Sequence, residues 1–155
     1  MTKDWKNMDL RTLPGHYVRR LNQLVVALYM AEVAEINLTP VQYAILQTIC
    51  NEPGIDQKTL ARTIGYDTAT IGSVIDRLES RGLVKRNVAS HDRRSRLITP
   101  TEEGRETLNA VVPRMLKSQE RFLKPLAKPE RKEFMRLMKI LIDANEELKN
   151  ISIEK

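Results

Sequence analysis

Basic side chains gather in one short stretch of this 155-residue chain. Between residues 81 and 96 there are six of them and a single acid, Asp92, so these 16 residues carry most of the net charge of +6. Such a density of positive charge is typical of a surface that binds a polyanion, and a solvated surface loop is the alternative. The basic residues are Arg81, Lys85, Arg86, Arg93, Arg94 and Arg96.

Groups that could catalyse a reaction are scarce. The chain has two histidines, His16 and His91, and one cysteine, Cys50, which are too few for a structural zinc site. It has no glycine-rich phosphate loop and no nucleophile elbow. The sequence therefore argues against an enzyme and predicts neither a cofactor nor a bound metal. Cys50 lies near the end of an apolar helix without a second cysteine, so we expect an inert thiol; a redox sensor is the alternative.

The composition is that of one globular domain, with 41% hydrophobic and 30% charged residues. No apolar run approaches the roughly 18 residues of a membrane-spanning helix. The first residues are polar and lack the apolar centre of a secretion signal. We therefore expect a cytoplasmic protein that does not interact with a membrane.

Several helices begin and end at recognisable residues. A helix is predicted from Pro14, because apolar residues follow it at spacings of three and four. Thr39 to Gln42 reads as a capping box that begins a second helix, which Pro53-Gly54 ends.

Two shorter helices follow. Asp56 caps the first, which Gly65 stops, and Asp67 caps the second, which Gly82 ends. Two short helices joined by a tight turn form the pattern of a helix-turn-helix.

The pattern changes after Gly82 to two predicted strands, 83–87 and 95–98, around a loop over 88–94 that has no tight-turn sequence. Thr99 and Pro100 then predict the start of a long helix, with Thr99 as its cap. Pro113 should kink that helix. A final helix follows, with an apolar stripe that includes Phe134, Leu137, Met138, Leu141, Ile142 and Leu148.

The helix after Asp67 has two unlike faces. Its inner stripe consists of Ile71, Val74, Ile75 and Leu78, and its outer face of Ala69, Gly72, Ser73, Asp76 and Ser80, with Thr70 and Arg77 at the edge. Small polar side chains let a helix enter a groove, where hydroxyls bond base edges and methyl groups contact thymine. Together with the basic hairpin, this face predicts double-stranded DNA as the partner. RNA would require more exposed aromatic residues than a 5% aromatic content supplies.

These segments carry a family resemblance. Leu60-Ala61, the run Leu78 to Val84, and the motif from Asp92 to Gly104 are similar to the MarR family of bacterial transcription regulators, although Ile98 stands where leucine is frequent. The resemblance implies a mainly α fold with a small β-hairpin wing, in which a winged helix-turn-helix is fused to a helical dimerisation region. Within one domain, 1–155, residues 39–99 would form the DNA-binding lobe, and 13–37 with 100–150 the dimerisation lobe.

The resemblance also implies which residues contact DNA. It places Thr68, Ala69, Thr70, Ser73 and Arg77 at the major groove or its flanking phosphates. It places Arg94 in the minor groove, where Asp92 fixes it through an ion pair. We further expect phosphate contacts from Lys85, Arg93 and Arg96, and contacts to the DNA backbone from Gln57 and Lys58.

The same resemblance implies a two-fold dimer through the terminal helices, and the apolar stripes on those helices support it. It also implies a small aromatic acid as effector, in a cleft lined by the first, second and fifth helices. Candidate ligand-binding residues are His16, Arg19, Arg20 and Tyr43; alternatively, Arg19 and Arg20 pair with acids across the dimer. The predicted function is a repressor that the effector releases from a palindromic operator, and a ligand-independent DNA-binding protein is the alternative.

Overall fold

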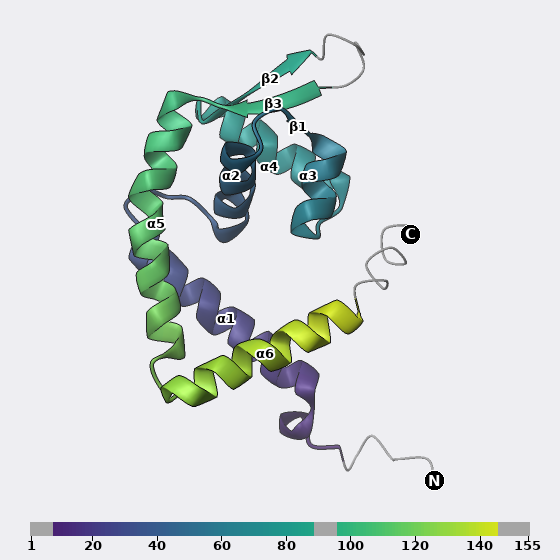
Figure 1. Cartoon of the computed structure of the whole chain (residues 1–155), viewed down its shortest axis with the longest axis vertical. Coiled ribbons are helices and arrows are strands. Elements are labelled where there is room, and N and C mark those ends of the chain that lie inside the picture. The colour runs from purple at the N-terminus through teal and green to yellow at the C-terminus, as the bar shows by residue number, and fades with distance from the viewer. Residues whose placement is uncertain (1–7, 89–95, 146–155) are drawn as a thin grey trace.

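The computed structural model describes residues 8–88 and 96–145, which form a mainly helical chain with one small antiparallel sheet (Figure 1). A single 3-10 turn, Leu10–Thr12, precedes the first long helix. The elements in chain order are α1 (Pro14–Val33), α2 (Pro40–Asn51), β1 (Ile55–Asp56), α3 (Gln57–Ile64), α4 (Thr68–Ser80), β2 (Val84–Val88), β3 (Arg96–Pro100), α5 (Glu102–Leu123) and α6 (Lys128–Ala144).

The sheet has three strands in the order β1-β3-β2, so the predicted hairpin is present but has an additional strand at its edge. In β2 and β3, Val84 lies opposite Pro100 and Val88 opposite Arg96. Ile55 in β1 lies opposite Ile98. Two residues are too few to give a strand pattern, which is why the sequence did not predict β1. The predicted loop over 88–94 falls, after Val88, outside the described residues.

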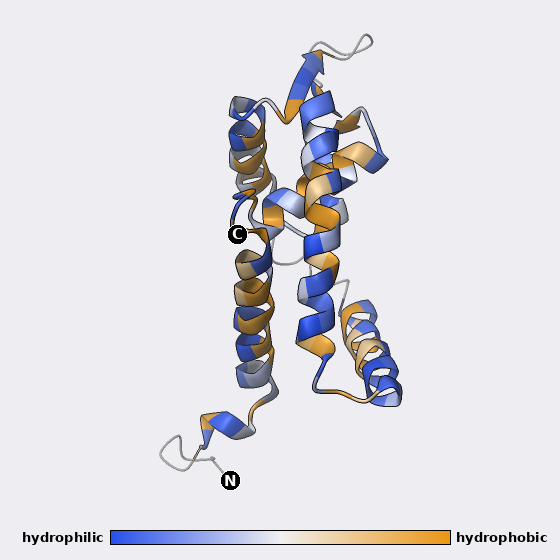
Figure 2. Cartoon of the chain, turned by 90° about the vertical axis from the view of Figure 1, so that its left-hand side faces the viewer, coloured by the Kyte–Doolittle hydropathy of each residue, from blue (hydrophilic) through white to orange (hydrophobic). Residues whose placement is uncertain are grey.

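The helices divide between the two ends of the molecule. In Figure 1, α2, α3 and α4 lie next to the sheet, whereas α5 runs from the sheet to the other end, where α6 begins. The last turns of α1 pack on α5. Figure 2 shows hydrophobic residues among polar ones on α1 and α6. No helix within 8–88 and 96–145 is long and apolar enough to cross a bilayer.

The core lies where α2, α3 and α4 meet the sheet. The predicted inner stripe of α4 is confirmed, because all four of its members are buried. The C-terminal end of α1 adds Tyr29 and Val33 to this core, and α5 adds Val111. Burying one such side chain contributes about 1.5–3 kcal/mol, so the stripe fixes which side of α4 faces outward.

Three of the predicted helix starts are confirmed. Thr39 and Gln42 form a reciprocal capping box, in which Thr39 N donates to Gln42 Oε1 at 3.0 Å and Gln42 N to Thr39 Oγ1 at 3.3 Å. Asp56 caps α3 and Asp67 caps α4 through their carboxylates.

The predicted start of α5 was wrong by two residues. Its cap is Thr101, and Pro100 is the last residue of β3. Pairing between β2 and β3 keeps Thr99 extended, and its hydroxyl accepts a hydrogen bond from Asn87 Nδ2 across the strands at 3.1 Å. Strand pairing therefore overrides a local capping signal. The helix then continues through Pro113 without a break.

The chain passes very close to itself where α5 begins. Thr101 Oγ1 donates to the carbonyl oxygen of Gly82 at 2.6 Å and accepts from Gly104 N at 3.0 Å, while Thr101 N donates to the carbonyl oxygen of Leu83 at 3.1 Å. A Cβ atom on Gly104 would lie 2.1 Å from that Leu83 oxygen. Only glycine lets the first turn of α5 approach the end of α4 this closely.

We therefore expect Gly104→Ala to lower the free energy of unfolding by roughly 1–3 kcal/mol, because the clash is with backbone that cannot rotate away. Gly15→Ala is the matched control, since a Cβ there meets nothing within 4 Å. It should leave stability unchanged or raise it by up to about 1 kcal/mol. Urea unfolding of both variants makes the comparison, and equal stabilities would contradict it.

Candidate nucleic-acid interface

The outer face of α4 is exposed along its length. Gly65 ends α3 in the left-handed conformation, with φ 73°, and the chain turns directly into α4. Five of the residues predicted to contact DNA lie on α4, outside its buried stripe. Thr68, Ala69, Thr70, Ser73 and Arg77 are all exposed.

The hydroxyl groups on this face are already oriented. Thr70 donates its backbone N–H to Asp67 Oδ1 at 2.8 Å and its hydroxyl to Oδ2 at 2.5 Å. These bonds, the hydroxyl first, lower the pKa of the Asp67 carboxyl. Ser73 Oγ donates to the carbonyl oxygen of Thr70 at 2.9 Å. Because both hydroxyl protons have acceptors within the helix, both oxygens present lone pairs, which suits them to accept from the amino group of a base.

Gln57 is the first residue of α3, and its side chain reaches the start of α4. Its Nε2 donates to the carbonyl oxygen of Thr68 at 3.0 Å, and a Cβ on Gly72 would lie 2.8 Å from that nitrogen. The side chain predicted to contact the DNA backbone thus also holds the first turn of α4. Its neighbour Lys58 is exposed.

The basic stretch divides into exposed and internally bonded residues. Lys85 on β2 and Arg96 on β3 are both exposed; Lys85 lies near the base of the hairpin, whereas Arg96 lies opposite Val88 at the far end of the paired strands. Arg81 instead donates to the carbonyl oxygens of Asn37 at 2.7 Å and Ile36 at 3.2 Å, and so joins the end of α4 to the α1–α2 connection. Asp92, Arg93 and Arg94, together with His91, lie outside the described residues.

Arg86 on β2 is also bonded internally. Its guanidinium lies 2.6 Å from Asp76 and 2.5 Å from Glu79, both on α4. Burial disfavours its charged form, but the two carboxylates outweigh this effect and raise the pKa of Arg86. This cluster was not predicted from the sequence, because only the fold places β2 against α4.

The predicted ligand residues do not converge within one chain. His16, Arg19 and Arg20 lie in the first two turns of α1, where Arg19 Nη2 is 3.4 Å from His16 Nδ1. Tyr43 on α2 packs against Tyr29, with ring centroids 6.2 Å apart. Arg19 is ten residues before Tyr29 and therefore about 15 Å away along the helix axis.

Tyr29 is a second residue that was not predicted from the sequence. Its hydroxyl is buried and has no hydrogen-bond partner in the described part of the chain. Burial, and to a smaller extent Tyr43, raises its pKa to about 12, so the group stays a neutral donor at physiological pH. The sequence does carry a signal for Tyr29, because this tyrosine stands among the apolar residues of α1. A buried tyrosine hydroxyl usually has a hydrogen-bond partner, so its position could have marked a binding site.

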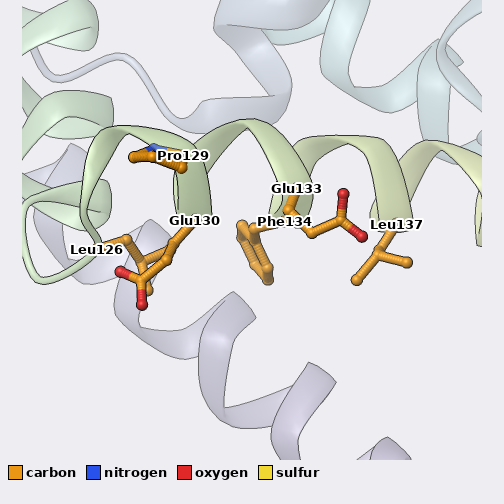
Figure 3. Close-up of a pocket in the computed structure, with 6 residues that line it drawn as sticks. All are labelled: Leu126, Pro129, Glu130, Glu133, Phe134 and Leu137. Carbon is orange, nitrogen blue, oxygen red and sulfur yellow. The ribbon is translucent and has the colours of Figure 1, made fainter.

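The helix α6 leaves its apolar side uncovered. None of its residues is buried, and Leu141 is 64% exposed. A hollow of about 440 Å³ lies along this helix. Figure 3 shows its lining residues, which are Leu126, Pro129, Glu130, Glu133, Phe134 and Leu137. No group of three or more His, Cys, Asp or Glu side chains within 8–88 and 96–145 is placed to hold a metal ion.

Comparisons with known proteins agree with this geometry. Residues 38–95 match the model of the MarR family. The chain is 34% identical over 136 residues to the transcriptional regulator HosA of Escherichia coli, an alignment that covers 88% of this chain and 99% of HosA.

Solved structures of regulators are similar over nearly the whole chain. The PcaV transcriptional regulator of Streptomyces coelicolor, in complex with its natural ligand, has a TM-score of 0.82 and 37% identity, covering 88% of this chain and 96% of PcaV. The repressor CouR bound to a 23-mer DNA duplex has a TM-score of 0.80 and 28% identity, covering 85% and 94%. BpsR of Bordetella bronchiseptica, whose DNA binding 6-hydroxynicotinic acid regulates, has a TM-score of 0.83 and 26% identity, covering 88% and 97%.

The contact between Gln57 and Gly72 can be tested by a double-mutant cycle. Gly72→Ala alone should leave the free energy of unfolding nearly unchanged, because better helix propensity, worth about 1 kcal/mol, is offset when Gln57 moves and its bond to Thr68 breaks. In a Gln57→Ala background, the same change should stabilise by about 1 kcal/mol. Equal effects of Gly72→Ala in the two backgrounds, measured by urea unfolding, would exclude the contact.

Proposed function

Because the chain belongs to the MarR family and is a DNA-binding transcriptional regulator rather than an enzyme, we propose that it acts as a homodimeric repressor that an aromatic carboxylate releases from a palindromic operator. The observation that carries the proposal is the exposed face of small and polar residues on α4, whose other side is fixed in the core. A helix of this kind can enter a major groove with its backbone close to the bases. In this proposal residues 39–99 are the DNA-binding lobe, and residues 13–37 and 100–150 the dimerisation lobe.

The proposed DNA contacts follow from the positions of the side chains. Thr68, Ala69, Thr70, Ser73 and Arg77 read the major groove or bind its flanking phosphates, which the exposure of all five on α4 supports. Lys58, Lys85 and Arg96 are exposed cations suited to phosphates, and Gln57 lies beside the first turn of α4. From the family motif alone we add Arg93 at a phosphate, and Arg94 in the minor groove with Asp92 supporting it.

The proposed dimer rests on apolar surface that the single chain leaves uncovered. Met135, Leu137, Ile140, Leu141 and Ile142 are exposed on α6. At the start of α1, Tyr17 and Val18 are exposed as well, the latter to 63%. Contiguous apolar surface on helices usually marks an interface, and a second copy of this chain offers a matching one.

The proposed ligand pocket lies where Tyr29 and Tyr43 meet. The buried Tyr29 hydroxyl can donate to a polar group of a ligand, and the two rings can pack against an aromatic one. Because Arg19 of the same chain is about 15 Å away along α1, we place the cation that pairs with the carboxylate on the second chain. An aromatic acid, 6-hydroxynicotinic acid, regulates DNA binding by the similar protein BpsR, and this supports the same class of ligand here.

Ligand binding would then act through the spacing of the two α4 helices. A dimer must hold them about one turn of DNA apart to occupy successive major grooves. Only a ligand that binds better to one spacing than to the other can shift the equilibrium. A cysteine-based switch is less well supported, because burial raises the pKa of the Cys50 thiol more than Arg105 lowers it.

One experiment tests the whole proposal: selection of bound duplexes from a random DNA pool, with and without 6-hydroxynicotinate, benzoate and 4-hydroxycinnamate. We expect a palindrome whose half-sites lie about 10–10.5 base pairs apart, and recovery that falls when an active acid is present. A single unpaired half-site would contradict the dimer. Equal recovery in all arms would favour the ligand-independent alternative.

Substitutions of base-contacting residues on α4 should change the base preference of DNA binding, whereas substitutions of phosphate-contacting residues on the hairpin should change its overall affinity. Ser73→Ala removes a group that accepts from a base, so it should change which base is preferred at one position. Arg96→Ala removes a phosphate contact, so it should weaken all sequences evenly and lower the salt slope by about 1. Ser80→Ala is the matched control, because Ser80 makes the same kind of internal bond, to Arg77 at 2.9 Å, in the last turn of α4. Binding to a panel of single-base operator variants distinguishes the three.

Ligand-pocket substitutions should separate the response from DNA binding. Tyr29→Phe and Arg19→Ala should retain operator affinity while the acid concentration needed for release rises about tenfold, the loss expected for one buried or charge-assisted hydrogen bond. Arg11→Ala is the control, since Arg11 is an exposed cation paired with Asp9 just before α1. Release titrations by fluorescence anisotropy measure the shift. An unchanged titration for both variants would place the ligand elsewhere.

A further inference from the structure

Two carboxylates lie on the side of α4 that would approach DNA. Asp76 is on the outer face with 67% of its side chain exposed, and Glu79 is at the edge of that face. Near phosphates, each carboxylate is repelled and lowers the affinity for a duplex. Their position therefore calls for a role other than contact with DNA.

Both carboxylates bind Arg86 on β2. Its Nη2 lies 2.6 Å from Asp76 Oδ1, and its Nη1 lies 2.5 Å from Glu79 Oε2. The backbone N–H of Arg86 donates to Glu79 Oε1 at 3.0 Å, and Nη2 also reaches the carbonyl oxygen of Gly72 at 3.4 Å. These contacts, which we call the Arg86 bridge, join three positions along two turns of α4 to one residue of the hairpin.

The Arg86 bridge engages both terminal nitrogens of the guanidinium. Only 14% of the Arg86 side chain is exposed, so it cannot reach a phosphate while these bonds are in place. A planar guanidinium between two carboxylates fixes the orientation of β2 relative to α4 as well as their distance, which a lysine ammonium would not do. The bridge also neutralises part of the negative charge that the two acids would otherwise present to DNA.

The Arg86 bridge fixes the middle of the β2–β3 hairpin relative to α4. Arg86 is the central residue of β2, which pairs with β3 from Val84 to Val88. Lys85 and Arg96, exposed on these strands, therefore hold a set position relative to the outer face of α4.

We propose that Arg86 is a positioning residue for DNA binding: held by Asp76 and Glu79, it makes α4 and the hairpin one rigid unit that is already ordered when it meets the duplex. This inference rests on the proposed function, in which the hairpin strands contact phosphates. In a rigid unit the cations are already in position before binding. Less conformational entropy is then lost when the duplex binds, so the affinity for DNA is higher.

The sign of one substitution separates this proposal from simple electrostatics. Asp76→Ala removes a negative charge beside the DNA, so electrostatics alone predicts tighter binding. The Arg86 bridge predicts weaker binding, on the order of fivefold, because the hairpin must then be ordered on the duplex. Asp76→Asn keeps one acceptor for Arg86, so its affinity for DNA should fall between those of Asp76→Ala and the unchanged protein. Asp143→Ala is the matched control, as it removes the same charge from another helical aspartate paired with a cation, Lys139 at 2.8 Å.

A double-mutant cycle shows whether the effect passes through the hairpin. Arg96→Ala should cost less affinity in the Asp76→Ala background than in the unchanged protein, on the order of threefold less, because its position is no longer fixed. Circular dichroism and thermal melting verify that each variant is folded, which an exposed aspartate replaced by alanine in a helix should remain.

The outcomes are distinguishable. Tighter binding by Asp76→Ala overturns the Arg86 bridge as a positioning device and leaves the proposed function standing. So does a measurable loss of affinity from Arg96→Ala that is equal in both backgrounds. No effect of Arg96→Ala in either background means instead that this proposed phosphate contact fails. Asp76→Ala alone then decides: weaker binding supports positioning through other hairpin residues, and tighter binding excludes it.

Discussion

The arrangement of this molecule depends on the burial of one side of α4. Ile71, Ile75 and Leu78 are completely buried between α2, α3 and the sheet, so the helix cannot rotate without exposing them. Burial of this stripe is worth several kcal/mol and fixes the opposite face outward. That face needs no large side chains for packing, and its small residues leave the backbone of α4 open to approach by a partner.

Interactions between sequence-distant residues then set where the neighbouring elements stand around α4. Gln57 holds its first turn from α3, and Arg81 joins its end to the connection that follows α1. Gly104 allows the start of α5 to lie against Leu83, directly after α4. The helix α4 is therefore held at both ends as well as along its inner side, and its position is a property of the whole lobe.

Local rules predicted most of the fold, and they failed where distant segments meet. Cap residues such as Asp56 and Asp67 were predictable, because an aspartate caps a helix through bonds within one turn. The cap of α5 was not, because strand pairing between β2 and β3 decided between Thr99 and Thr101. For the site, the sequence predicted the exposed face of α4. It counted Arg81 and Arg86 as part of the DNA-facing charge, since no sequence spacing reveals their internal partners.

The same contacts connect the proposed ligand pocket to α4. The last turns of α1 are held on α5 by Glu32, which pairs with Lys117 at 2.9 Å and Arg121 at 2.5 Å. Just beyond them, Asn37 accepts from Arg81 at the end of α4. Tyr29 lies one turn before Glu32. A ligand that displaces the end of α1 would therefore act on α5 through the ion pairs of Glu32 and on α4 through the hydrogen bond between Asn37 and Arg81. Coupling of this kind needs two packed arrangements of the α1–α2 connection. Asn37 lies within this connection at φ 53°, a left-handed conformation that is held by the surrounding structure in the arrangement seen here.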